Sequence, residues 1–281
     1  MILRKSLAVL LSLAMLIMVF PAGVITVSAE NTTEFLGGEG TEESPYLIST
    51  KDHLNNVRKY LDAHFKMVAD IVFTEEDFAK DGDFYNGGQG WEPFGINEDS
   101  AFTGMFDGDG HSITGLICDR TDSGSMYVGL FSYNNGHIQN LSMIDVHVYA
   151  STTSPSAPVR VGGISGYNDG TISNCYNTGN IISNSFNNYA CAGGISGYNN
   201  GTIINCYNTG MISSVSAFSY VGGGIAGDNR GTISSCYNTG NVTARVVSVG
   251  VGGIAGRNFD ASTINNCYNI GKINAISSVD A

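Results

Sequence analysis

A phrase of ten residues recurs four times in the second half of the chain, and it constrains the fold more than any other feature. The copies are GTISNCYNTG from Gly170, GTIINCYNTG from Gly201, GTISSCYNTG from Gly231 and STINNCYNIG from Ser262. Each copy belongs to a longer unit, and the unit starts lie 34, 31, 30 and 29 residues apart, at Gly129, Gly163, Gly194, Gly224 and Gly253. Self-similarity at a near-constant period is typical of repeat architectures, in which each unit packs against its neighbours.

The composition of the units favours stacked β-coils. Each unit holds short apolar-centred segments separated by Asn-Gly, Asp-Gly or Thr-Gly pairs, and none has the spacing of an amphipathic helix. A propeller blade needs four strands and roughly 40 residues, so a period near 30 favours one coil of a β-helix. Charged residues are 14% of the chain and apolar residues 42%. A low charge fits stacking, because like charges in neighbouring coils repel each other across one strand spacing.

Stacking predicts ladders of identical residues, since neighbouring coils lie about 4.8 Å apart. Three interior ladders are expected, one for each side of the coil. They are Ile172, Ile203, Ile233 and Ile264; Ile164, Ile195, Ile225 and Ile254; and Ile181, Ile212, Val242 and Ile273. Sharp turns with positive φ are expected at the recurring corner glycines, Gly179, Gly210, Gly240 and Gly271.

Cysteines recur at one position of four coils, Cys175, Cys206, Cys236 and Cys267. An even number of cysteines in an exported chain is typical of disulfides. In-register parallel neighbours, however, point their Cβ atoms side by side and not toward each other. A ladder of buried, reduced thiols is therefore the favoured interpretation, with disulfides as the alternative. Ile172 and Cys175 differ in parity, so a bend or bulge between them is needed to bury both.

The N-terminus has the pattern of a secretory signal peptide. Arg4 and Lys5 precede the apolar run SLAVLLSLAMLIMVF, and Val27 and Ala29 are the small residues expected before a cleavage site. The run is short for a membrane span, and no later segment is apolar enough to be one. We therefore predict a mature chain that is secreted or at the cell surface and has no membrane span. A retained N-terminal anchor is the alternative.

The repeat unit resembles the GLUG repeat of bacterial exported and surface proteins, through GGISGYN and GTISNCYNTG. The lead-in segments GEGTEESPYLIST, FKMVADIVF, GWEPFGI, FTGMFDGDGHSITGL and YVGLFSYNNGHIQNL extend the resemblance over most of the mature chain. Such proteins include adhesin-like proteins and immunoglobulin A-cleaving metallopeptidases, whose non-catalytic N-terminal part carries the repeat. The resemblance implies an all-β fold, a right-handed parallel β-helix, in an extracellular setting. It implies no activity, because one fold hosts many functions.

We expect three segments in the chain. They are a signal peptide at 1–29, an N-terminal cap with lead-in coils at 30–125, and the repeat β-helix at 126–281. In the lead-in, Thr50 is placed to act as N-cap of a helix near 51–61, which would cover the open edge of the first coil.

Charge argues against a nucleic-acid partner. The formal net charge is −12, and the acids concentrate before residue 151, while the repeats beyond it are close to neutral. The sequence contains no recurring pattern of Lys or Arg that would form a basic stripe, so binding to the phosphate backbone of a nucleic acid is not expected.

No catalytic residues, metal ligands or cofactor are predicted. The five histidines lack the His-Glu-x-x-His spacing of zinc peptidases, and the carboxylates of the repeats are not stacked in pairs. The lead-in is richer in acids, including Asp107 and Asp109 of the FDGDGH turn. A calcium site or the acids of a carbohydrate-active β-helix are the alternatives there, and solvated turns are favoured.

The candidate binding surface is a second kind of ladder, made of tyrosines. Tyr167 and Tyr198 form a short pair, and a longer row follows the cysteines, at Tyr176, Tyr207, Tyr237 and Tyr268. Such a row could contact an extracellular carbohydrate or a host or cell-surface protein, or the rings could simply stack and shield the coil. We predict a non-enzymatic, structural or adhesive protein. The alternatives are a carbohydrate-active β-helix and an N-terminal fragment of a longer surface protein or peptidase.

Overall fold

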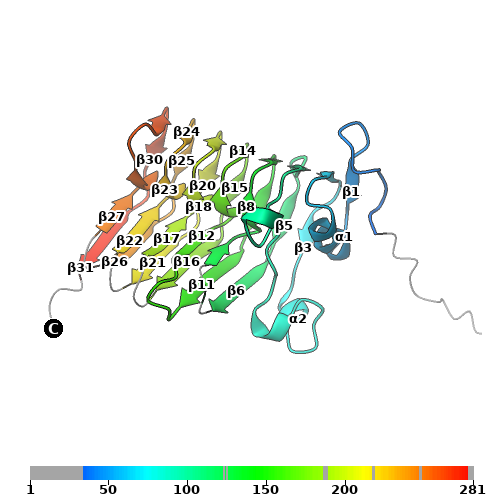
Figure 1. Ribbon diagram of the computed structural model, residues 1–281, viewed down its shortest axis with the longest axis horizontal. Helices are drawn as coiled ribbons and strands as arrows, with labels where there is room; N and C mark the ends of the chain where they lie inside the picture. Colours follow the sequence, from blue (N-terminus) through cyan, green and yellow to red (C-terminus); the bar gives the residue numbers. More distant parts are fainter. Residues whose placement is uncertain are drawn as a thin grey trace, which may run out of the picture. The chain divides into compact units, whose positions relative to one another are not determined.

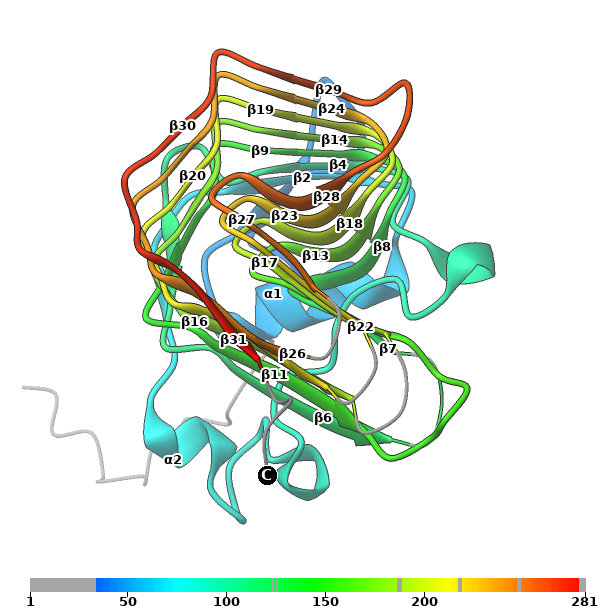
Figure 2. The same ribbon diagram turned by 90° about the vertical axis from the view of Figure 1, so that its left-hand side faces the viewer.

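The computed structural model describes residues 34–277, except for 123, 125, 186–188, 217–218 and 247–248. The predicted signal peptide, 1–29, lies outside these residues. Five sheets make up the fold, and their named strands pair only in parallel within the described residues. The chain is therefore a parallel β-solenoid of about five turns. In Figure 2 the C-terminal coil faces the viewer, and the chain runs counter-clockwise while it advances, so the solenoid is right-handed.

The two sheets that hold the repeated phrase are the longest. The first, the β9 sheet, consists of β1 (Tyr46–Ile48), β2 (His64–Met67), β4 (Met105–Asp107), β9 (His137–Gln139), β14 (Thr171–Ser173), β19 (Thr202–Ile204), β24 (Thr232–Ser234) and β29 (Thr263–Asn265). The second, the β15 sheet, consists of β3 (Ile71–Val72), β5 (Ser112–Thr114), β10 (Ser142–Ile144), β15 (Tyr176–Asn177), β20 (Tyr207–Asn208), β25 (Tyr237–Asn238) and β30 (Tyr268–Asn269). Strands of the lead-in and strands of the repeats thus share sheets (Figure 1). The boundary at 125/126 stays a prediction.

Three further sheets complete each coil. The β11 sheet consists of β6 (Ile117–Asp122), β11 (His147–Thr152), β16 (Asn180–Ser185), β21 (Ile212–Ser216), β26 (Val242–Val246) and β31 (Ile273–Ser277). The β12 sheet consists of β7 (Met126–Val128), β12 (Val159–Gly162), β17 (Tyr189–Gly193), β22 (Ser219–Gly223) and β27 (Val249–Gly252). The β13 sheet consists of β8 (Phe131–Asn134), β13 (Ser165–Asn168), β18 (Ser196–Asn199), β23 (Ala226–Asn229) and β28 (Ala255–Asn258). In Figure 2 the β12 and β13 sheets turn inward, so the outline of the coil is indented on one side.

Register confirms the predicted aliphatic ladders. Ile172 pairs with Ile203, and Ile181 with Ile212, in the parallel ladders of the first and third sheets. In the remaining ladder, which contains Ile164 and Ile195, neighbouring coils are joined through backbone hydrogen bonds, such as the one from the Ile164 N–H to the carbonyl of Ile195. Its members and those of the other two ladders are fully buried through the fourth repeat coil, whereas in the last coil Ile264 is 37% exposed, because no described coil covers it.

The corner that buries both Ile172 and Cys175 is made by Asn174, which has φ of 53°. A left-handed residue reverses the alternation, so two residues three apart both point inward. Asparagine is one of the few non-glycine residues that adopts this conformation readily. The equivalent residues have the same conformation in the other coils: Asn140, Asn205, Ser235 and Asn266.

The prediction of positive φ at the corner glycines is wrong. Gly179, Gly210, Gly240 and Gly271 all lie at corners, but none is among the positive-φ residues. Glycine is required there for space, because a Cβ on Gly210 would lie 1.9 Å from the carbonyl oxygen of Gly179 in the coil before it. The glycine column therefore sets how closely successive coils approach.

Two buried amide ladders run along the stack beside the aliphatic ladders. In one, Asn177 donates to Asn208 at 2.8 Å and Asn208 donates to Asn238 at 2.8 Å. The other runs from Asn134 through Asn168, Asn199 and Asn229 to Asn258, with donor–acceptor distances of 2.7 or 2.8 Å. Buried amides are stable here because their donors and acceptors meet partners in neighbouring coils and in the adjacent backbone.

The cysteine ladder consists of free thiols, as favoured from the sequence. Cys175, Cys206 and Cys236 are buried, and Cys267 is partly exposed. Each thiol donates to a nearby carbonyl, for example Cys206 to Ile204 at 3.2 Å. Burial is the largest cause of the raised pKa of Cys206, so this thiol stays protonated and unreactive at neutral pH.

The first coil is covered by a short helix, as predicted, although the helix is shorter than 51–61. Helix α1 (Lys51–Asn56) continues as the 3₁₀ turn η1 (Val57–Lys59), and Thr50 accepts a hydrogen bond from the N–H of His53 at 3.1 Å. Leu54 and Val57 are fully buried and join the core of the first coils. The remaining short elements are α2 (Glu75–Phe78), η2 (Asn86–Gly88) and η3 (Glu98–Ser100). No helix of the described residues is long and apolar enough to cross a membrane.

Candidate functional site

The four predicted tyrosines form one continuous stack on the β15 sheet. Their strands pair in register, so each ring lies over the ring of the next coil. The ring centroids of Tyr176, Tyr207, Tyr237 and Tyr268 are separated by 4.7, 4.7 and 5.1 Å, with interplanar angles of 3° to 6°. The stack brings together all four residues that the sequence singled out.

The geometry of this tyrosine ladder limits what it can offer to a ligand. Because the rings lie face to face, each inner face is largely covered by its neighbour, as the simple stacking interpretation predicts. The exposed parts are ring edges and phenol hydroxyls, together with Tyr268 at the end of the stack, which is 55% exposed. Burial and the neighbouring phenols raise the pKa of Tyr207, so its hydroxyl stays protonated and can donate a hydrogen bond. The ladder thus presents a row of hydroxyls at one strand spacing.

A second cluster lies where the β12 and β13 sheets meet at the indentation of the coil. Two columns of outward-pointing side chains face each other there, and we call them the arginine–tyrosine seam. One column is Tyr127, Arg160, Cys191 and Val221 on the β12 sheet. The other is Tyr133, Tyr167, Tyr198, Asp228 and Arg257 on the β13 sheet. Glycine lets the sheets approach, since a Cβ on Gly197 would lie 2.6 Å from the backbone nitrogen of Val161.

The first coils of the seam are aromatic. Tyr133, Tyr167 and Tyr198 continue one stack, with Tyr167 and Tyr198 at 4.9 Å and an interplanar angle of 10°. Tyr127 packs against Tyr133 at 4.6 Å. The predicted pair of Tyr167 and Tyr198 is therefore part of a larger group. Burial raises the pKa of Tyr133 far above its ordinary value, and the neighbouring Tyr127 contributes to the shift.

Arg160 lies among these rings. Its guanidinium lies 4.7 Å from the centroid of the Tyr198 ring and 5.1 Å from that of Tyr127, and it donates a hydrogen bond to the Tyr127 hydroxyl. Its Nε is buried and has no hydrogen-bond partner. Within the described residues no carboxylate lies within ion-pair distance of Arg160.

The last coils of the seam replace tyrosine with an ion pair. Arg257 donates from Nε and from its terminal nitrogen to the two carboxylate oxygens of Asp228, at 2.7 and 2.6 Å. Asp228 is 1% exposed, and the buried thiol of Cys191 lies 3.6 Å from its Oδ2. The hydrogen bonding of Arg257 to the Asp228 carboxylate is the largest cause of the raised pKa of Arg257. A carboxylate so deeply buried requires such a bidentate partner.

The sequence carried a signal for this pair that the prediction missed. Aligned units read GYN, GYN, GDN and GRN at one position, so Asp228 and Arg257 fall in neighbouring coils, one strand spacing apart. Opposite charges at one ladder position predict an ion pair as directly as identical residues predict a stack. The convergence of Arg160 and Tyr127 with the tyrosine column had no such signal, because it depends on the angle between two sheets.

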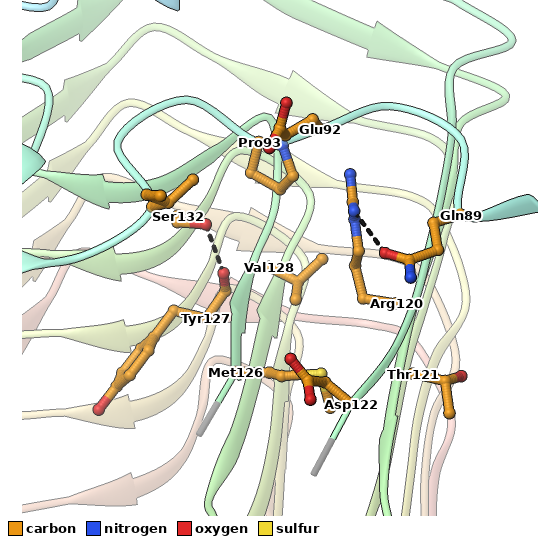
Figure 3. Close-up of a pocket in the computed structure, with 11 residues that line it drawn as sticks. Gln89, Glu92, Pro93, Arg120, Thr121, Asp122, Met126, Tyr127, Val128 and Ser132 are labelled. Atoms are coloured by element: carbon orange, nitrogen blue, oxygen red, sulfur yellow. Dashed lines mark hydrogen bonds between the residues drawn. The ribbon is translucent and has the colours of Figure 1, made fainter. Parts of the chain in front are cut away.

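A pocket of about 190 Å³ opens at the N-terminal end of the seam (Figure 3). Arg120 lies in its wall, where it donates to Gln89 at 2.7 Å and to the carbonyl of Trp91. Glu92, also in the wall, pairs with Arg58 at 3.2 Å. Arg120 of β6 thus holds the lead-in loop against the coils, and Glu92 ties the loop to η1. The pocket is smaller than the sites that usually bind organic ligands.

The acids of the lead-in are held in structural contacts. Burial raises the pKa of Asp107, but hydrogen bonds from Asn140, from the N–H of Asp109 and from Gln139 outweigh it and lower the pKa overall. Asp109 pairs with Lys66 at 3.1 Å. Where the structure describes the chain, no group of three His, Cys, Asp or Glu side chains could hold a metal ion.

The fold and the repeated ladders define a class of protein, the repeat β-solenoids with parallel strands. Comparison with known families gives the particular repeat: a model of the GLUG motif matches residues 157–182 and 248–274. The chain therefore carries GLUG-type repeats in these two segments. The matched segments contain Cys175 and Tyr176 of one coil and Cys267 and Tyr268 of another, so both ladders belong to the motif.

Two curated relatives share about half of the chain. A protein of Evansella cellulosilytica, provisionally named a Gly-rich membrane protein, is 41% identical over 153 residues, which are 53% of this chain and 16% of that protein. Halomucin of Haloquadratum walsbyi is 33% identical over 166 residues, which are 56% of this chain and 2% of halomucin. The chain thus corresponds to a small part of both relatives.

A similar fold occurs among solved structures. One is a crystal structure from Bacteroides ovatus of a protein provisionally called an immunoglobulin A1 protease. It superposes with a TM-score of 0.63 at 24% identity, and the match covers 87% of this chain and 86% of that one. At this identity the likeness extends to the fold alone. The matched family model describes the repeat and not a catalytic domain.

Proposed function

We propose that this chain is an exported structural or adhesive module at the surface of a bacterial cell. On this proposal residues 1–29 are removed as a signal peptide, residues 30–125 form the N-terminal cap and the lead-in coils, and residues 126–281 display the ladders. The sequence pattern of the N-terminus supports export. The name of the Evansella cellulosilytica relative, a Gly-rich membrane protein, supports a surface location.

The tyrosine ladder is the proposed contact surface, and its regular row of hydroxyls is the observation that carries this proposal. The centroids of the four rings lie 4.7, 4.7 and 5.1 Å apart, so the rings form one line. A ligand that is itself extended and repetitive can meet several hydroxyls at once, and a rigid row loses little conformational entropy on binding. An extracellular polysaccharide and an extended segment of a surface protein both have this form.

Substitution by phenylalanine separates the hydroxyls from the stack. The double variant Tyr207→Phe, Tyr237→Phe removes two hydroxyls and keeps the rings, so glycan-array or cell-attachment signal should fall while the melting temperature stays unchanged. Tyr149→Phe, which lies on β11 outside the ladder, is the matched control. Undiminished attachment by the double variant contradicts binding through this row.

Alanine at the same two positions tests the simpler role of the rings as a shield. If the ladder only covers the coil, Tyr207→Ala with Tyr237→Ala lowers the melting temperature and leaves attachment per folded molecule intact. If the ladder also binds, attachment of the folded fraction falls as well. Far-UV circular dichroism on the same samples measures that fraction.

Two other functions carry their own tests. A carbohydrate-active β-helix would use lead-in acids such as Asp107, and it predicts new reducing ends from a polysaccharide that vanish in Asp107→Asn. A module of a longer surface protein or peptidase is in keeping with the fold shared with the Bacteroides ovatus protein and with the small share of each relative that the chain covers. The coding sequence after Ala281 decides that alternative.

A further inference from the structure

A cluster of three guanidinium groups lies beside the seam, from Arg160 on β12, Arg230 directly after β23 and Arg257 on β28. We call it the arginine patch, and its members are Arg160, Tyr198, Arg230, Arg257 and Phe259. The Arg230 guanidinium lies 5.9 Å from the centroid of the Tyr198 ring and 3.9 Å from that of Phe259. Arg257 lies 5.0 Å from the same Phe259 ring. Aromatic rings thus hold all three cationic groups in defined positions.

The charge of the patch is opposite to that of the chain as a whole. The formal net charge of the chain is −12. At the patch, Arg257 is paired with Asp228, while Arg160 and Arg230 have no ion-pair partner among the residues that the structure describes. The nearest acid on the same column is Asp169, which accepts a hydrogen bond from the intervening Asn200 at 2.6 Å. The patch is therefore positive.

Packing alone does not require these arginines. The position of Arg230 is occupied by Asn135, Asp169 and Asn200 in earlier coils, and each of those coils stacks in the same way. An exposed arginine there adds no hydrogen bond within the described residues, and it brings a second charge next to the guanidinium of Arg257. Such an arrangement is favourable when an anion lies between or beside the cations.

Stacking on aromatic rings leaves the edges of a guanidinium free. Its N–H groups lie in the plane of the group, while the ring contacts only its face. The in-plane N–H fork is the geometry that binds a carboxylate or sulfate through two hydrogen bonds. Because the rings already fix the arginines, less side-chain entropy is lost when an anion binds.

We infer that the arginine patch binds acidic sugar units of an extracellular polysaccharide, through carboxylate or sulfate groups. Arg230 contacts the anion from the exposed side, and Arg160 and Tyr198 form the inner wall of the site. The acidic lead-in repels polyanions and the other repeat positions are close to neutral, so the patch fixes where the polysaccharide binds. This site is distinct from the tyrosine ladder. It rests on the proposed function only for the choice of a glycan as ligand.

The test measures binding of the full chain to four polymers at about 0.15 M salt, where the Debye length is about 8 Å. Polygalacturonate carries carboxylates, dextran sulfate carries sulfates, dextran is neutral, and poly-glutamate is an acidic peptide. We expect the acidic polysaccharides to bind and dextran not to bind. The stronger of the two acidic polysaccharides identifies the anion. Absence of binding to both, or equal or tighter binding of poly-glutamate, overturns the inference.

Two matched variants localise the binding. Arg230→Gln should weaken it about tenfold, the loss expected for one charge-assisted contact. Arg245→Gln removes the same charge from an exposed position on β26, and it should change the affinity less than twofold. Equal losses in both variants show unspecific charge attraction and overturn the inference. Circular dichroism confirms that both variants fold, which is expected because both side chains are exposed.

A third variant separates this site from the tyrosine ladder. Tyr207→Phe with Tyr237→Phe should bind polygalacturonate like the wild type, even where it loses attachment through the ladder. Loss of polygalacturonate binding in that variant places the acidic polymer on the ladder and overturns the separate site. Conversely, failure of Arg230→Gln to weaken binding leaves the ladder proposal untouched.

Discussion

The buried amide ladder allows a sharp test of the coil stacking, at Asn208. Its side chain is fully buried and makes four hydrogen bonds. Nδ2 donates to Oδ1 of Asn238 at 2.8 Å and to the carbonyl of Gly210 at 2.9 Å. Oδ1 accepts from Nδ2 of Asn177 at 2.8 Å and from the N–H of Gly210 at 3.2 Å. Asn208→Asp keeps the shape of the side chain but replaces both N–H donors with an oxygen.

The cost of Asn208→Asp depends on pH. With the carboxyl protonated, one O–H replaces two N–H donors, so one buried acceptor loses its partner at a cost of about 1–3 kcal/mol. Ionisation in the buried ladder is unfavourable, and a folded-state pKa about 3 units above the ordinary 3.9 is typical of such a site. Because the folded pKa is raised, the protonated form predominates at low pH and the penalty grows as pH rises. It adds about 4 kcal/mol by pH 7.

Urea denaturation, followed by circular dichroism at pH 7 and pH 4, measures this difference. We expect a loss in the free energy of unfolding of about 6 kcal/mol at pH 7 and about 2 kcal/mol at pH 4, each relative to the wild type at that pH. Asn205→Asp is the control, since Asn205 lies on an exposed corner and its side-chain amide donates to Asn174 at 3.2 Å. It should lose less than about 1 kcal/mol at either pH. Equal losses in the two variants, or no pH dependence in Asn208→Asp, would refute the buried ladder.

Three further outcomes follow from the same contacts. Gly210→Ala places a Cβ 1.9 Å from the backbone of the preceding coil and should lower the melting temperature sharply, whereas Gly124→Ala, with no atom within 4 Å of the new Cβ, should leave it unchanged. Thiol titration of the native protein at neutral pH should leave Cys206 unlabelled, because burial raises its pKa, and all six cysteines should react after unfolding without a reductant. Fewer than six reactive thiols would indicate disulfides. Asp228→Ala leaves its arginine partner unpaired and should cost about 3–5 kcal/mol in urea denaturation, against less than about 0.5 kcal/mol for the exposed Asp169→Ala.

The interior of the solenoid could be predicted because stacking places each residue next to its equivalents in the coils before and after it. Once the period is known, each position has the same neighbour above and below, so Ile172 and Cys206 were placed without knowledge of the path within a coil. The path itself was less accessible. The left-handed corner at Asn174 was needed to reconcile two inward residues three apart, and the sequence showed only that a bend was required. At Gly210 the glycine was attributed to a positive φ, whereas it is required by the close approach of two coils. That approach is not visible in the sequence of one unit.

The arginine–tyrosine seam was harder to predict for a physical reason. Register relates residues along one sheet, but Arg160 and Tyr198 lie on different sheets, and only the inward turn of the β12 and β13 sheets brings them together. That turn depends on contacts such as Gly197 against Val161, and although the glycine recurs in the units from Gly163 onward, an alignment of units does not show which strand it contacts. A ladder position can be read from an alignment of units, whereas an angle between sheets requires the structure.

Positions that vary between coils are therefore the informative ones in a stacked repeat. An identical residue in every coil is explained by its copies above and below, as for the cysteine and glycine columns. A change from Tyr198 to Asp228 to Arg257 breaks that self-consistency, and each step needs its own compensation. Asp228 is compensated by Arg257 inside the fold, at 2.6 Å. Arg230 has no such compensation within the described chain, and this difference is why we assign it to an external anion and not to packing.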